Sequence, residues 1–179
     1  MLNMHKKDLL LLCMVFSYII AIIYCYRKYS CSYSVSNMIC GNNCNNIVLA
    51  SMIFMGIFTI LYEIARNDNI SLACIVSLLI GIYGVIKIDE TNNTHYVFAA
   101  VVFLSIICFM INHYYVTACD ILYFLLFLQI LFLCFTIINI TSYSLFIYGE
   151  ILFILNFAVF YLYLHYKTRK DKRKKKRQK

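Results

Sequence analysis

The chain has 179 residues, of which 63% are hydrophobic, and it carries a formal net charge of +8. That hydrophobic share exceeds the roughly 45–50% of an average soluble domain, which argues against a soluble globular protein. Ten of the sixteen Lys and Arg residues lie in the last thirteen positions, 167–179, so the basicity belongs to a tail rather than to a domain. For that reason no nucleic-acid partner is expected.

Six apolar stretches follow one another along the chain, each near the roughly 20 residues with which an α-helix crosses a bilayer. Lipid offers no hydrogen-bond partners to backbone N–H and C=O groups, so a spanning segment must satisfy them within a helix or a closed barrel. Because the alternating pattern of a transmembrane barrel is missing, these stretches are predicted to be helices. The sequence thus predicts an all-α polytopic membrane protein, a six-transmembrane-helix bundle over residues 1–166 with a polybasic tail at 167–179. The predicted spans are about 9–26, 47–65, 70–88, 96–114, 118–139 and 143–165.

The distribution of basic residues predicts the orientation of this bundle. Lys and Arg accumulate on the cytoplasmic side of membranes, so the tail is expected in the cytoplasm. An even number of spans then places both termini there, with thirteen basic residues on that side and three on the other. The exterior or lumenal loops are accordingly expected near 27–46, 89–95 and 140–142.

Ionisable residues within spans are costly and are read first as functional candidates. Glu150 is the eighth residue of the last predicted span, about 10 Å from its lumenal end. His95 precedes the fourth span from the same side, and Asn139 ends the fifth. These three residues form a candidate polar cluster in the lumenal leaflet. The alternative is that Glu150 is an interhelical hydrogen-bonding anchor and His95 an interfacial residue.

A second polar group is expected near the cytoplasmic face: Glu63, Arg66, His113 and Asp120. Glu63 and Arg66 are three residues apart and can pair along one helix. Snorkelling of side chains toward the interface accounts for most of this group. Gln129 and Asn156, near the middle of their spans, are expected to hold helices together.

Small residues recur in the third span at Ala73, Ser77, Gly81 and Gly84. This spacing lets two helix backbones approach closely, so it favours helix packing over a ligand site. No catalytic motif, cofactor site or metal site is expected, since the four His residues are scattered.

The first lumenal loop contains three of the nine cysteines, Cys31, Cys40 and Cys44. In an oxidising lumen, one disulfide among them would act as a structural clip, and a redox role is the less favoured alternative. Asn92, in the sequence Asn92-Asn93-Thr94, is a candidate glycosylation site on the same side.

The tail is expected to bind anionic lipid as well as to fix orientation, because a basic cluster beside a span is attracted to the cytoplasmic leaflet. Its last residues also loosely resemble a dibasic endoplasmic-reticulum retrieval signal. The basic residues assigned to lipid binding are Lys170, Lys172, Arg173, Lys174, Lys175, Lys176 and Arg177.

The layout resembles the DRAM (damage-regulated autophagy modulator) family and its FRAG/SFK-type relatives. The third span, Leu72 to Gly84, is similar to the small-residue-rich third helix of that family, and His95 follows at the head of the fourth. The last span, with Ile147-Tyr-Gly-Glu150 and an aromatic-rich remainder, is similar to its last helix. The chain departs from the family in having no Pro, in Ile151 after Glu150, and in being short.

That resemblance implies an endomembrane protein of the endoplasmic reticulum or lysosome, linked to autophagy, cell death or lipid handling. The first functional hypothesis is therefore a non-enzymatic modulator that acts through membrane lipids and membrane-protein partners. The second is a small ion, proton or solute transporter using Glu150 and His95. The third is a lipid-modifying enzyme that uses His95 with Glu150 or Asp89 as an acid/base pair.

Overall fold

The computed structural model describes residues 2–28, 46–88 and 92–177. The described residues form six α-helices, and no strand occurs among them: α1 (Leu2–Lys28), α3 (Asn46–Arg66), α4 (Asn69–Lys87), α5 (Asn93–Thr117), α6 (Asp120–Ile138) and α7 (Tyr143–Arg177). The all-α prediction is therefore confirmed for the described part of the chain. The predicted disulfide cysteines Cys31, Cys40 and Cys44 lie outside it.

Four helices are long and apolar enough to cross a membrane: α4, α5, α6 and the Leu145–Lys170 part of α7. This result covers only described residues, and side chains at 2–5, 21–22, 25–28 and 46–49, in α1 and α3, lie outside the description. The chain thus has multi-pass membrane character. The six-span count stays a prediction.

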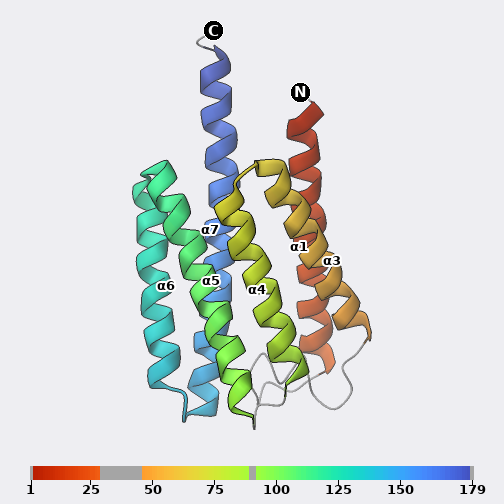
Figure 1. Cartoon of the computed structure of the whole chain (residues 1–179), viewed down its shortest axis with the longest axis vertical. Helices are drawn as coiled ribbons and strands as arrows, with labels where there is room; N and C mark the ends of the chain where they lie inside the picture. Colours follow the sequence, from red (N-terminus) through yellow and green to blue (C-terminus); the bar gives the residue numbers. More distant parts are fainter. Residues whose placement is uncertain (1, 29–45, 89–91, 178–179) are drawn as a thin grey trace. The chain divides into compact units, whose positions relative to one another are not determined.

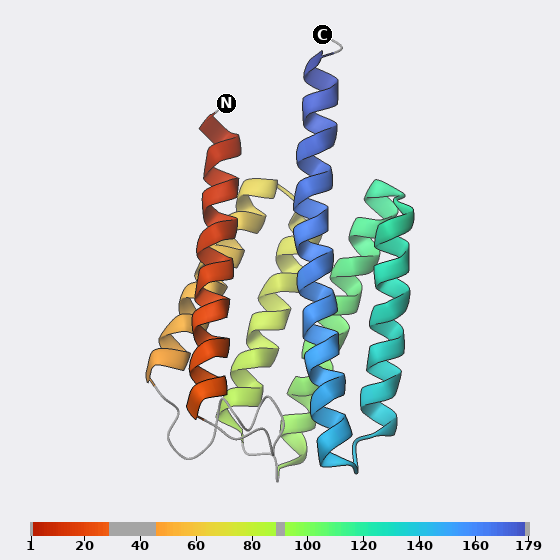
Figure 2. The same ribbon diagram turned by 180° about the vertical axis from the view of Figure 1, so that it is seen from behind.

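The chain divides into two compact units, residues Met1–Phe109 and Met110–Lys179. In the first unit α1 packs on α3 and α3 on α4, and Figure 1 shows α1 and α3 side by side and antiparallel. In the second unit α6 packs on α7, also as an antiparallel pair, seen from behind in Figure 2.

Two helices end in residues with left-handed backbone conformation. Asn67, with φ of 62°, and Ala118, with φ of 43°, follow α3 and α5. The Asn67 N–H donates to the Glu63 carbonyl and the Ala118 N–H to the Tyr114 carbonyl, the pattern of a left-handed C-terminal cap. Asn tolerates this conformation better than Ala, so the turn after α5 carries the greater backbone strain.

The start of α4 is fixed by its N-cap residue, Asp68. Its carboxylate accepts hydrogen bonds from the Ser71 backbone N–H at 3.2 Å and from the Ser71 hydroxyl at 2.8 Å. An Asp at this position satisfies N–H groups that have no partner within the helix and is favoured by the helix dipole. The short turn between α3 and α4 is therefore well defined by local hydrogen bonds.

Small residues set the packing distance of α4. A Cβ added to Gly81 would lie 2.8 Å from Val102 Cγ2 and 3.2 Å from the Phe98 carbonyl oxygen. A Cβ added to Gly84 would fall against the ring of Phe98. Ser77 accepts a hydrogen bond from the Ser105 hydroxyl at 3.0 Å. Three of the four small residues of the third span therefore face α5, whereas Ala73 is exposed.

Candidate functional site

The three residues of the predicted polar cluster do not share one unit. His95 belongs to the first unit, whereas Asn139 and Glu150 belong to the second. Their grouping as one site therefore stays a prediction.

His95 lies in the first turn of α5 and is buried. Its Nδ1 atom is 2.8 Å from the carbonyl oxygen of Ile88, the residue that caps the C-terminus of α4. Its backbone N–H donates to the Asn92 carbonyl at 2.9 Å. Because a carbonyl oxygen only accepts hydrogen bonds, Nδ1 carries the proton and donates it to the Ile88 carbonyl. His95 thus joins the end of α4 to the start of α5.

The candidate glycosylation residue Asn92 immediately precedes α5 and is exposed. Its Oδ1 accepts the backbone N–H of Thr94 at 2.9 Å, which is the geometry of a helix N-cap. The side-chain amide that a glycan would modify is therefore hydrogen-bonded, through its oxygen, to the first turn of α5.

Asn139 and Glu150 lie on either side of the connection between α6 and α7. Asn139 is the C-cap residue of α6, and its Nδ2 donates to the Phe135 carbonyl at 2.8 Å. Glu150 is half-buried in α7. Its neighbour Gly149 is buried, and a Cβ there would meet the Thr136 side chain of α6. This end of the helix pair is therefore tightly packed beside Glu150.

An amide pair, Gln129 and Asn156, joins α6 to α7 at mid-helix. Gln129 Nε2 donates to the Phe153 carbonyl at 3.0 Å, and Asn156 Nδ2 donates to the Leu125 carbonyl at 2.8 Å. Asn156 Nδ2 also donates to Gln129 Oε1. Both side chains are buried. The amides therefore have the helix-joining role expected of them.

Replacing Asn156 with leucine should weaken the α6–α7 pair. The substitution removes two donated hydrogen bonds and leaves the buried Gln129 oxygen without its partner, at a cost of about 1–3 kcal/mol. Reversible unfolding in mixed detergent micelles measures this loss. The double substitution Gln129→Leu with Asn156→Leu should cost less than the sum of the two single changes, and strict additivity would contradict the direct bond.

Glu63 and Arg66 form a buried ion pair on α3. Arg66 Nη1 is 3.2 Å from Glu63 Oε1, and the two side chains are 10% and 0% exposed, respectively. The guanidinium carbon of Arg66 lies 5.8 Å from the ring centre of Tyr62 and 5.9 Å from that of Phe109. Cation–π contact with two rings and the ion pair together offset the cost of burying the charge.

The predicted pairing of Glu63 with Arg66 is thus confirmed, but the snorkelling interpretation is wrong for this pair. Arg66 turns back over aromatic rings instead of extending toward water. His113 is also buried, at 2% exposure. The spacing of three residues revealed the pair, whereas nothing local in the sequence revealed that Phe109, 43 positions later, would cover it.

Cys119 occupies the N-cap position of α6, between α5 and α6. Its Sγ lies 3.7 Å from the Tyr163 hydroxyl of α7. Burial raises the pKa of the thiol, but the Tyr163 hydroxyl, the Ile121 and Leu122 backbone N–H groups and the charge of Lys167 bring that pKa below its usual range. Helix N-termini and nearby cations stabilise thiolates in this way.

Alkylation of Cys119 should therefore persist to lower pH than alkylation of an ordinary cysteine. A lowered pKa leaves more thiolate at neutral pH, and thiolate is the reactive form. Iodoacetamide labelling across pH, read by mass spectrometry of the peptide, measures the midpoint. The Tyr163→Phe variant should move this midpoint upward. An unchanged midpoint would contradict stabilisation by the hydroxyl.

Among the described residues, no group of three or more His, Cys, Asp or Glu side chains could hold a metal ion. Comparisons with protein-family models, with curated proteins and with solved structures found no match to this chain.

Proposed function

We propose that this chain is a six-span membrane protein with both termini in the cytoplasm, acting without catalysis through contacts with lipids and membrane-protein partners. In this proposal it is a short, divergent protein of the DRAM type, located in the endoplasmic reticulum or the lysosome. It serves autophagy, cell death or membrane lipid handling.

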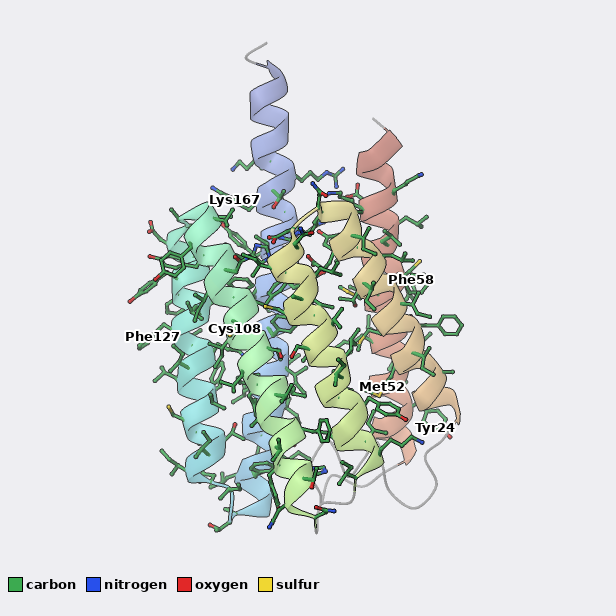
Figure 3. The ribbon with its side chains drawn as sticks, viewed as in Figure 1. Tyr24, Met52, Phe58, Cys108, Phe127 and Lys167 are labelled. Atoms are coloured by element: carbon green, nitrogen blue, oxygen red, sulfur yellow. The ribbon has the colours of Figure 1, made fainter. Side chains whose placement is uncertain are left out.

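The observation that carries the proposal is the continuity of α7. One helix runs from its apolar part, Leu145–Lys170, to Arg177 within the basic tail, and both views show it extending past the end of α6 (Figures 1 and 2). Lys167, near this end of α7, is labelled in Figure 3. A span that continues directly into basic residues favours a cytoplasmic C-terminus that attracts anionic headgroups.

The polar side chains of the helices support a non-catalytic role. His95, Gln129 and Asn156 have partners that join neighbouring helices or connections, and Arg66, paired with Glu63 on α3, lies over Phe109 of α5. The transporter hypothesis needs His95 and Glu150 to act jointly, and the enzyme hypothesis needs His95 with Glu150 or with Asp89, which lies outside the described residues. No observed geometry favours either of these hypotheses over the non-catalytic one.

The test is removal of residues 167–179 from the full chain. We expect the shortened protein to float less with phosphatidylserine vesicles and to change its location in cells, while Glu150→Gln mainly lowers the yield of folded protein. A matched variant with the tail's Lys and Arg replaced by Gln separates charge from length. An ion flux in liposomes that Glu150→Gln abolishes without loss of yield would overturn the proposal in favour of a transporter.

A further inference from the structure

The exposed tyrosines lie near the ends of the apolar helices. Among the described residues six tyrosines are exposed, between 52% and 78%: Tyr83, Tyr96, Tyr115, Tyr123, Tyr148 and Tyr166. Tyr83 lies in the last turns of α4, Tyr96 in the first turn of α5 and Tyr115 in its last turn. Tyr123 is in the first turn of α6. Such amphipathic rings are enriched at both membrane–water interfaces, where an apolar body and a polar tip are satisfied together.

The spacing of these tyrosines along single helices matches the thickness of a bilayer core. Tyr148 and Tyr166 on α7 are 18 residues apart, which corresponds to about 27 Å. Tyr96 and Tyr115 on α5 are 19 residues apart, or about 28 Å. The hydrocarbon core of a typical bilayer is about 30 Å thick. Two helices therefore carry tyrosines at nearly the same, membrane-sized interval.

The exposed residues of α7 between its two tyrosines are all apolar, and the polar side chains Glu150, Tyr163 and His165 in the same stretch are half-buried. The exposed residues there are Ile151, Leu152, Leu155, Val159 and Leu162. The side chains beyond Tyr166 change character at once, with Lys167 half-exposed and Lys170 exposed. On α6 the exposed face is likewise apolar, and Phe127 points outward from it (Figure 3).

We propose that these six tyrosines mark the two borders of the bilayer hydrocarbon core. Tyr83, Tyr96 and Tyr148 lie at one border and Tyr115, Tyr123 and Tyr166 at the other, with lipid chains as the partner of the surface between. This inference rests on the proposed function in that the chain must span a membrane. It adds the register of each helix in the bilayer.

The register changes the setting of Glu150 and of the basic residues that follow Tyr166. Glu150 is two residues from Tyr148, about 3 Å along α7, so it lies at the headgroup border rather than deep in the core. Lys167 and Lys170 follow Tyr166 within about 6 Å and lie at the level of lipid phosphates. The first basic residues of α7 at the level of anionic headgroups are therefore Lys167, Arg169 and Lys170.

The experiment uses tryptophan as a depth probe, since the chain has none. Single Tyr→Trp variants at Tyr96, Tyr115, Tyr148 and Tyr166 of the full chain are reconstituted into phosphatidylcholine vesicles brominated near the headgroup or near the chain ends. Leu104→Trp and Leu155→Trp are the matched controls, because both sites are exposed and lie at least about 10 Å from either tyrosine of their helix.

We expect the four Tyr→Trp variants to lose more fluorescence with shallow bromine than with deep bromine, and the two controls to show the reverse. Stronger quenching of the Tyr→Trp variants by deep bromine would overturn the register while leaving a membrane-spanning chain. Absence of quenching at all six sites by either lipid would overturn the membrane-spanning proposal itself. All six sites are exposed, so the added indole displaces lipid rather than core.

Discussion

Replacing Arg66 with alanine is expected to lower the free energy of unfolding by about 3–5 kcal/mol, the range for removing one partner of a buried ion pair. Glu63 is fully buried, and the guanidinium that neutralises it also covers the rings of Tyr62 and Phe109. Unfolding in mixed micelles, followed by circular dichroism, measures the loss.

The control for this variant is Lys87→Ala, which removes an exposed cation at the end of another helix of the same unit. Surface changes of this kind usually stay within about 0.5 kcal/mol. The double variant Glu63→Gln with Arg66→Ala should recover part of the loss, since the buried carboxylate is then neutral. A loss for Arg66→Ala no larger than for Lys87→Ala would contradict a buried, stabilising pair.

Replacing Gly84 with alanine is expected to cost about 1–3 kcal/mol, the range for overpacking a close contact. The new methyl group would fall against the ring of Phe98, so α4 and α5 would have to separate or the ring would have to turn. The same unfolding measurement reports the cost.

Gly56→Ala provides the matched control. Its Cβ would lie 3.3 Å from Leu79 Cδ2, the end of a flexible side chain that can shift by a few tenths of an ångström. Gly84→Ala combined with Phe98→Ala should cost less than the sum of the two single changes, because the shortened side chain leaves room for the new methyl group. An equal loss of unfolding free energy for Gly84→Ala and Gly56→Ala would contradict a close contact between α4 and α5 at Gly84.

The sequence predicted the helices well because long apolar stretches in this chain admit only one regular structure. The predicted spans 70–88 and 96–114 correspond closely to α4 and α5. The last predicted span, 143–165, lies within α7, which runs on to Arg177 through residues of high helix propensity. Hydropathy predicts where the apolar segment ends but not where the helix ends, because Lys and Arg have high helix propensity and let the helix continue into the basic tail.

Side-chain environments were harder to predict, because they depend on residues distant in sequence. The small residues Gly81 and Gly84 indicated close packing from their spacing alone, yet Ala73 fits that spacing and is exposed. The burial of Arg66 depends on Phe109 of another helix. His95 was singled out for its ionisable ring, whereas its contact with the Ile88 carbonyl reflects the geometry of a turn.

The sidedness of the loop at 27–46 tests the central claim most directly. A protease-cleavable tag is placed after Gly41 and a second tag after Lys179, and sealed microsomes are digested from outside. Six spans with cytoplasmic termini predict that the C-terminal tag is lost while the loop tag survives until detergent is added. Loss of both tags before detergent would show that α1 and α3 do not span, and survival of the C-terminal tag would reverse the orientation.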